Sequence, residues 1–171
     1  KRDCDGFERM YGRKPELIFP ITSPKVDLDA VPVLTAINRP FLLFVGADFY
    51  PNIEGIVWFI EHVSPFIQLD LRIVGACCNN PTLRNKTLSN VKLEGYVDDL
   101  SSYYKSALAV VAPIFKGSGM KTKVIEAMSF GKSIIGTDEA FQGIECDYCR
   151  MGGKCNTCLL YTSPSPRDGA T

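Results

Sequence analysis

From residue 40 onward, short runs of apolar residues alternate with longer stretches in which apolar positions recur every three or four residues. The short runs are typical of strands buried on both faces, and the three- and four-residue spacing is typical of amphipathic helices. Five segments are predicted as strands: residues 41–45, 71–75, 91–95, 108–112 and 133–136. Strands that alternate with helices form parallel sheets with right-handed crossovers. The pattern therefore predicts an α/β fold with an open, doubly wound parallel sheet.

Residues with capping preferences indicate where the helices between these strands begin and end. After Pro51, Asn52 is predicted to cap a helix whose apolar positions run from residue 53 to residue 63. Asp98 is predicted to cap a second helix that continues to residue 107. A third helix, from about residue 120 to residue 130, is expected to end at Gly131, because glycine readily adopts the left-handed conformation that follows a helix.

Prolines are frequent in the first 36 residues, where they surround the short apolar segment 17–19. Proline at this density is incompatible with a central strand or a helix interior. We expect residues 1–36 to be the end of a preceding domain followed by a linker, and residues 37–157 to form the α/β domain, incomplete at its C-terminal end. The prolines in question are Pro15, Pro20, Pro24 and Pro32.

The composition of the chain narrows the classes of function. Its 171 residues are 46% apolar and 22% charged, which is ordinary for a globular domain. The 19 Lys and Arg balance 19 Asp and Glu, so no excess of positive charge favours a nucleic acid partner. The longest apolar runs, such as residues 107–115, are shorter than the roughly 20 residues of a transmembrane helix, and no signal segment opens the sequence. We therefore expect a soluble, cytoplasmic protein.

The C-terminal tail is treated apart from the domain. Residues 158–168 resemble one reading frame of a sequencing adapter, so residues 158–171 are predicted to be non-native and outside the fold. This prediction affects two Cys-x-x-Cys pairs that would otherwise suit a four-thiolate zinc site. If the last of these cysteines is not native, the fourth ligand is lost; no metal is expected, and the 7 cysteines are expected to be reduced thiols. The pairs are Cys146 with Cys149 and Cys155 with Cys158.

The segment between the fourth predicted strand and the following helix carries the strongest chemical signal. Gly117 and Gly119 flank Ser118, and a glycine turn lets a ligand approach the free N–H groups of a helix N-terminus. The partial positive charge of that terminus favours an anion such as a phosphate. Lys121 and Lys123 add two cations to the same turn, where they oppose the helix dipole unless an anion binds. These residues therefore predict a phosphate site.

Other polar and aromatic residues each have a simple interpretation. Glu126 lies three residues after Lys123, so it could either accept hydrogen bonds from two sugar hydroxyls or form a solvated surface pair with that lysine. His62, the single histidine, is expected to be a partly exposed helical residue and not a catalytic base. Three aromatic residues are expected to pack in the domain, unless one of them faces the ligand: Trp58, Tyr103 and Tyr104.

The glycine turn and the helix after it, GSGMKTKVIEAMSFGKSIIGT at residues 117–137, resemble the signature of the group 1 retaining glycosyltransferases of GT-B fold. The resemblance covers roughly residues 40–145. It implies a Rossmann-like nucleotide-sugar-binding domain, the C-terminal half of a GT-B enzyme. Shorter motifs follow the order that the family shows: FVG at 44–46, PN at 51–52, IVG at 73–75, GYVDDL at 95–100 and GI at 143–144.

The resemblance implies roles for individual residues. Lys123 is expected to contact the donor diphosphate and Glu126 the ribose hydroxyls, and these two are the expected catalytic residues. The turn at residues 95–97 is expected to border the base, and Gly46 and Asn52 are expected to face the sugar-phosphate. The residues expected to bind the donor beside the catalytic pair are Gly46, Asn52, Gly95, Tyr96, Val97, Gly117, Ser118, Gly119, Met120 and Lys121.

The reaction that the resemblance implies is transfer of a hexose-type sugar from a nucleoside diphosphate sugar to an acceptor, with retention at the anomeric carbon. The charge that develops on the leaving diphosphate has to be stabilised. Since GT-B members generally use basic side chains and helix N-termini for this, no metal and no other cofactor is expected. Many relatives have an acidic residue eight positions before the equivalent of Glu126, where it touches the donor sugar. Ser118 stands there in this chain, so sugar recognition is left open.

The acceptor is expected to be a sugar, a lipid-linked sugar or a polysaccharide. It would bind to an N-terminal domain that we expect to be missing from this chain, so the fragment by itself should bind the donor without turnover. The resemblance also allows peripheral membrane association through that domain.

Three alternatives remain open. A nucleotide-sugar epimerase would use a similar architecture and donor site but would need no acceptor. A dinucleotide-dependent oxidoreductase is disfavoured, because the turn at residues 46–51 lacks the G-x-G-x-x-G spacing. A non-catalytic α/β interaction module would have no reason to place Lys121, Lys123 and Glu126 at a glycine turn.

Overall fold

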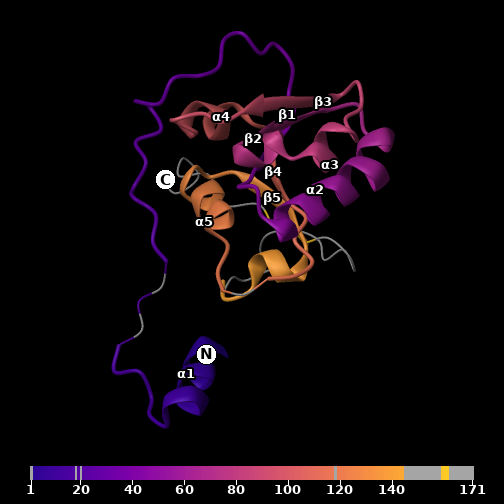
Figure 1. Ribbon diagram of the computed structural model, residues 1–171. Helices are drawn as coiled ribbons and strands as arrows, with labels where there is room; N and C mark the ends of the chain where they lie inside the picture. Colours follow the sequence, from indigo (N-terminus) through magenta and orange to yellow (C-terminus); the bar gives the residue numbers. More distant parts are fainter. Residues whose placement is uncertain (1, 18, 20, 118, 145–158, 162–171) are drawn as a thin grey trace.

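The computed structural model describes residues 2–17, 19, 21–117, 119–144 and 159–161 (Figure 1). A six-stranded sheet with the order β3-β2-β1-β4-β5-β6 forms its centre. The first five strands are parallel, and β6 is antiparallel to β5. The parallel α/β sheet predicted from the sequence is thereby confirmed. The strands are β1 Phe41–Val45, β2 Asp70–Val74, β3 Val91–Gly95, β4 Ala109–Ala112, β5 Ser133–Gly136 and β6 Leu159–Tyr161.

Helices cover both faces of this sheet, as expected for a doubly wound fold. On one face lie α2 (Tyr50–His62) and the short α3 (Pro81–Arg84), and on the other lie α4 (Ser101–Ser106) and α5 (Thr122–Ser129) (Figure 1). A further helix precedes the domain, and short 3-10 helices follow α2, β2 and β5. These elements are α1 Arg2–Tyr11, η1 Ser64–Phe66, η2 Ala76–Asn79 and η3 Asp138–Phe141.

The inner strand β1 is apolar throughout because both faces of the sheet are buried at this strand. Successive side chains of a strand point to opposite faces of the sheet. Phe41 and Leu43 therefore pack in the core that contains α4 and α5, whereas Leu42 and Phe44 pack in the core that contains α2 and α3. Each of the four side chains is at most 4% exposed. A strand in this position cannot alternate between apolar and polar residues, because both of its faces are buried.

The predicted cap of α2 is wrong. The helix begins at Tyr50, and its N-cap residue Phe49 makes no side-chain capping bond. Asn52 lies inside the first turn, where its Nδ2 donates a hydrogen bond to the Ala47 carbonyl oxygen at 3.0 Å. Pro51 is tolerated in that turn because proline has no N–H to satisfy there. The helix therefore starts three residues earlier than the capping preference of asparagine suggested.

The ends of α4 and α5 follow the sequence more closely. Before α4 the N–H of Ser101 donates to Asp99 Oδ1 at 2.9 Å, so the carboxylate of Asp99, and not that of Asp98, satisfies the free N–H. The N-cap residue of α4 is Leu100, which makes no side-chain capping bond, so the predicted cap at Asp98 is wrong by two residues. After α5, Gly131 has a φ of +61° and its N–H donates to the Met128 carbonyl oxygen at 2.9 Å. The predicted glycine end of α5 is confirmed.

The segment that leads into β1 is held against α4 by hydrogen bonds. Lys105 Nζ donates to the Leu28 carbonyl oxygen at 2.6 Å and also to that of Val31. The Leu34 N–H donates to Ser106 Oγ at 2.9 Å. No strand and no α-helix occurs between residues 12 and 40 in the described part of this segment, in agreement with its prolines. The helix α1 was not predicted from the sequence, and the domain boundary near residue 36 stays a prediction.

The strand β6 lies in the C-terminal segment that was predicted to be outside the fold. Leu160 pairs with Ile135, so β6 extends the sheet at its β5 edge. The prediction that residues 158–171 lie outside the fold is therefore wrong for the three residues of β6, whereas their non-native origin stays a prediction. The cysteines from Cys146 to Cys158 lie outside the described residues; Cys4, Cys77 and Cys78 are free thiols. None of the helices in the described part of the chain has the length and apolar character that crossing a bilayer requires.

Candidate functional site

The turns after the parallel strands meet at one edge of the sheet. The Gly46 N–H donates to the Val74 carbonyl oxygen at 3.0 Å, and the Gly75 N–H donates to that of Gly95 at 2.7 Å. A Cβ atom on Gly75 would lie 2.3 Å from the Gly46 carbonyl oxygen, and the φ of Gly75 is +115°. Only glycine permits so close a backbone approach. In an open α/β sheet this edge is where ligands bind.

The ammonium group of Lys123 reaches this edge from the first turn of α5. Its Nζ lies 2.8 Å from Asn52 Oδ1 on α2 and 4.1 Å from the ring centroid of Phe44 on β1. Lys123 is only 8% exposed. A Cβ atom on Gly46 would lie 2.8 Å from the same phenylalanine ring, so Gly46 borders this group as well. The structure thus brings together Gly46, Asn52 and Lys123, three residues that the sequence analysis assigned to one site.

The charge of this ammonium group has no anionic partner close by. Among the described residues, no carboxylate lies within ion-pair distance of Lys123 Nζ. Burial lowers the pKa of Lys123 to about 8. The nearby Cys77 and Glu126 raise this pKa, but their effect is weaker than that of burial. The hydrogen bond with Cys78 and burial raise the pKa of Cys77, so this thiol supplies no charge at neutral pH. A buried cation without a counter-ion is unfavourable and favours an incoming anion.

Lys121 is arranged differently. It is the N-cap residue of α5, and its Nζ donates to the Gly119 carbonyl oxygen at 2.8 Å and lies 3.2 Å from Glu139 Oε1. A Cβ atom on Gly117 would lie 3.4 Å from this nitrogen, so the side chain folds back over the glycine turn. The charge of Lys121 is therefore paired with a carboxylate, whereas that of Lys123 is not.

The glycine turn itself has the backbone that its sequence suggested. Gly117 has a φ of +152° and Gly119 a φ of +70°, and the space beside Gly119 is open. Ser118 lies outside the described residues. The side chain of Met120 lies against Gly143, where a Cβ atom would be 2.9 Å from Met120 Cγ. Met120 therefore anchors the turn to the segment after η3.

Glu126 is placed one turn further along α5. Its Oε2 accepts a hydrogen bond from the hydroxyl of Tyr104 at 2.9 Å. Tyr104 is 1% exposed and stacks on Phe130, so it packs in the domain as predicted. Burial and the neighbouring Glu126 carboxylate raise the pKa of Tyr104. The phenol therefore remains a hydrogen-bond donor and fixes the carboxylate, and the surface pair between Lys123 and Glu126 does not form.

The turn after β3 lies at the same edge of the sheet. Gly95 has a φ of +79°, with open space beside its Cα atom. Tyr96 is 72% exposed, whereas Val97 packs against the core that contains Tyr104 and α5. The backbone of residues 95–97 is thus accessible on one side and anchored on the other.

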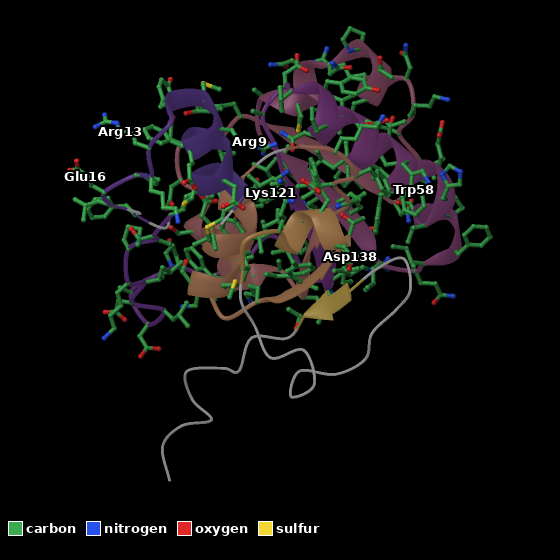
Figure 2. All side chains as sticks on the ribbon, turned by 90° about the horizontal axis from the view of Figure 1, so that it is seen from below. Arg9, Arg13, Glu16, Trp58, Lys121 and Asp138 are labelled. Atoms are coloured by element: carbon green, nitrogen blue, oxygen red, sulfur yellow. The ribbon has the colours of Figure 1, made fainter. Side chains whose placement is uncertain are left out.

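The remaining candidates lie elsewhere. Trp58 packs with Phe115 and His62 on the outer part of α2, and Figure 2 shows it well apart from Lys121. His62 is exposed at the end of that helix, and its Nδ1 lies 3.0 Å from the Trp58 carbonyl oxygen. In the described residues, no group of three or more His, Cys, Asp or Glu could hold a metal ion. Phe44 and Cys77 also lie beside Lys123 but were not predicted from the sequence, because strand and core residues carry no local signal of a site.

Comparisons with known proteins agree with the fold. Residues 39–163 match the family model described as "Glycosyl transferases group 1". A search of curated protein sequences finds no match. Among solved structures, the fold is similar to WaaG, "a glycosyltransferase involved in lipopolysaccharide biosynthesis", with a TM-score of 0.54 and 18% identity over 78% of this chain and 41% of that one. It is also similar to the GtfA/B complex, with a TM-score of 0.52 and 17% identity over 80% of this chain and 28% of that one. The chain thus spans less than half the length of either structure.

Proposed function

Since the chain belongs to the group 1 glycosyltransferase family, we propose that its α/β domain binds the nucleoside diphosphate part of a nucleotide-sugar donor. The complete protein would transfer the sugar to an acceptor with retention at the anomeric carbon. The observation that carries this proposal is the buried ammonium group of Lys123, which lies at the carboxyl edge of the sheet without a counter-ion. A diphosphate supplies the missing negative charge.

The chemistry of this site is the stabilisation of a leaving group. When the bond between the anomeric carbon and the diphosphate breaks, negative charge grows on the departing phosphate oxygen. A pre-placed ammonium group in a site of low polarity stabilises that charge more strongly than water does. Lys123 is held before the ligand arrives, so little reorganisation is required at the moment of reaction. The glycine turn before α5 allows the phosphates to approach the backbone closely.

Glu126 is proposed to bind the ribose hydroxyls, since it lies three residues after Lys123 on α5 and Tyr104 fixes its carboxylate. Replacing Glu126 by glutamine is expected to weaken the binding of a nucleoside diphosphate about tenfold, because one charge-assisted acceptor is lost. The same change should leave the affinity for inorganic pyrophosphate nearly unaltered. Calorimetric titration of UDP, ADP, GDP and pyrophosphate measures both effects.

The matched control for this change is Glu61→Gln. Glu61 lies on the outer part of α2 and pairs with Lys86 on the surface. It is expected to change neither affinity. Absence of binding of all three nucleoside diphosphates to the unaltered chain would contradict the proposed function, and an equal loss for pyrophosphate would contradict the role of Glu126.

Binding of the diphosphate is expected to depend on pH through Lys123. The pKa of its ammonium group in the free protein is lowered to about 8 by burial, so the lysine is protonated at pH 7 and loses its proton as the pH rises through 8. Because the ligand binds to the protonated form, affinity should be constant below pH 8 and should fall above it, by up to about tenfold for each further pH unit. Above pH 8 the phosphates of ADP are fully ionised, so they add no further change in affinity there. Titrations from pH 6.5 to 9.5 that gave constant affinity would exclude Lys123 as the cation involved.

A further inference from the structure

Asn52 uses both ends of its side-chain amide inside the site. Its Oδ1 accepts a hydrogen bond from Lys123 Nζ at 2.8 Å, and its Nδ2 donates to the Ala47 carbonyl oxygen at 3.0 Å. The first partner belongs to α5 and the second to the turn between β1 and α2. A single amide therefore connects the turn after β1 with the helix that follows the glycine turn. Sequence separations of 71 and 5 residues show that the first contact is tertiary and the second local.

The orientation of this amide is determined by its partners. An ammonium group can only donate, and a backbone carbonyl oxygen can only accept. The oxygen of Asn52 must therefore face Lys123, and its nitrogen must face Ala47, because the opposite orientation would place like groups together. An aspartate could not donate to Ala47, and an alanine could make neither bond. Asparagine satisfies both positions and brings no charge.

The absence of charge on Asn52 matters because of the groups around Lys123. Cys77 from η2 is a neutral thiol, and Glu126 from α5 is engaged by Tyr104. The aromatic ring of Phe44 from β1 attracts the ammonium group without neutralising it. In the described part of the chain, Asn52 and the ring of Phe44 contact the ammonium group, and both hold it in place without neutralising its charge.

We propose that Asn52 is a positioning residue, which holds the Lys123 ammonium group at the diphosphate subsite while leaving its charge for the ligand. This role rests on the proposed function, since it requires that an anion binds to Lys123. Asn52 thereby acts through Lys123 and not by direct contact with the reacting atoms.

Two substitutions of Asn52 separate geometry from charge. In Asn52→Asp the carboxylate pairs with the ammonium group, so the pKa of Lys123 should rise above about 8, and the affinity for ADP at pH 7 should fall at least tenfold although the lysine stays protonated. In Asn52→Ala the acceptor is lost, so the pKa of Lys123 should fall by about 1 or more, with the pH limit of ADP binding moving down by the same amount. If Asn52 served only to pack the turn, Asn52→Ala would leave the pKa of Lys123 unchanged.

The lysine pKa is measured by NMR titration of ¹³C-labelled lysine Cε, with the Lys123 signal assigned by its loss in Lys123→Met. This measurement needs no nucleotide. The control is Asn85→Ala, an exposed asparagine after α3 whose loss should leave the pKa of Lys123 unchanged. If neither Asn52 variant shifts the pKa of Lys123, the positioning role is overturned.

The same pair of measurements distinguishes this role from the proposed function. If the pKa values shift as expected in both variants but the unaltered chain binds none of UDP, ADP and GDP, the proposed function fails, and Asn52 is left as a residue that holds Lys123 without a ligand. If the nucleotides bind and Asn52→Asp binds them as tightly as the unaltered chain, the charge argument is wrong. Circular dichroism of each variant confirms that the fold is retained.

Discussion

Replacing Lys123 by methionine is expected to lower the affinity for a nucleoside diphosphate at least tenfold and to raise the stability of the free domain. The loss of binding follows from removal of the uncompensated cation at the donor site. Methionine has a similar length, so it fills the space that the lysine occupies. An alanine at this position should lose the same affinity but leave a cavity.

The gain in stability has a separate cause. The ordinary pKa of lysine is 10.5, and burial lowers that of Lys123 to about 8. Between these values the unfolded chain binds more protons than the folded one, so the stability of the unaltered protein rises with pH from 8 to 10.5. Below pH 8 the buried charge is therefore destabilising, by roughly 3 kcal/mol on this shift. Loss of the hydrogen bond from Lys123 to Asn52 offsets part of this, and about 1 to 2 kcal/mol should remain.

Denaturant unfolding at pH 7 and pH 10 tests this expectation together with calorimetric titration of ADP. The unaltered domain should gain more stability between the two pH values than the methionine variant, in which only other groups such as Lys132 contribute. If Lys123→Met bound ADP normally, Lys123 could not be part of the donor site. If it were less stable than the unaltered protein at pH 7, the claim that the buried charge destabilises the domain would be wrong, but the donor site would not be affected.

Replacing Gly55 by alanine is expected to destabilise the domain by about 3 kcal/mol or more, or to prevent folding. Gly55 lies in the middle of α2, where the helix crosses the turn after β4. A Cβ atom there would lie 1.6 Å from the Pro113 carbonyl oxygen and 2.8 Å from its carbon. Both contacts are with backbone, so no side-chain rotation relieves them, and the helix would have to move away from the sheet. The first turn of α2, which carries Asn52, would move with it.

The matched control is Gly6→Ala, since Gly6 also lies inside a helix. No atom lies within 4 Å of a Cβ placed on Gly6, so this change should be neutral or slightly stabilising. Thermal and denaturant unfolding of the two variants compares them directly. If Gly55→Ala were as stable as the unaltered chain, α2 could not lie as close to β4 as the structure places it.

The strands are the part of the fold that could be predicted most closely from sequence. Three predicted strands have the same bounds as β1, β3 and β5 in the structure: residues 41–45, 91–95 and 133–136. A strand that is buried on both faces leaves a continuous apolar run, and turns with glycine or proline mark its ends. The helix starts could not be predicted from capping preference, because the N-cap residues of α2 and α4 are Phe49 and Leu100, which make no side-chain capping bond.

The sequence predicted which residues belong to the candidate site, but not which contacts they make. The glycine turn and the two lysines after it indicated an anion site, and the local sequence treats Lys121 and Lys123 alike. The structure separates them, since Lys121 pairs with Glu139 and Lys123 is buried beside Asn52. These partners lie 18 and 71 residues away in the sequence.

The sequence by itself determined the order of strands and helices, the positions of the turns and the residue types available at the edge of the sheet, because periodicity and turn chemistry are local properties. Only the tertiary structure decided which lysine keeps a free charge and why residue 55 has to be glycine. On helix propensity alone, alanine would be preferred at Gly55. The close approach of the Pro113 carbonyl oxygen reverses that preference, because contacts between distant segments depend on how the helices cross the sheet, which no local pattern encodes.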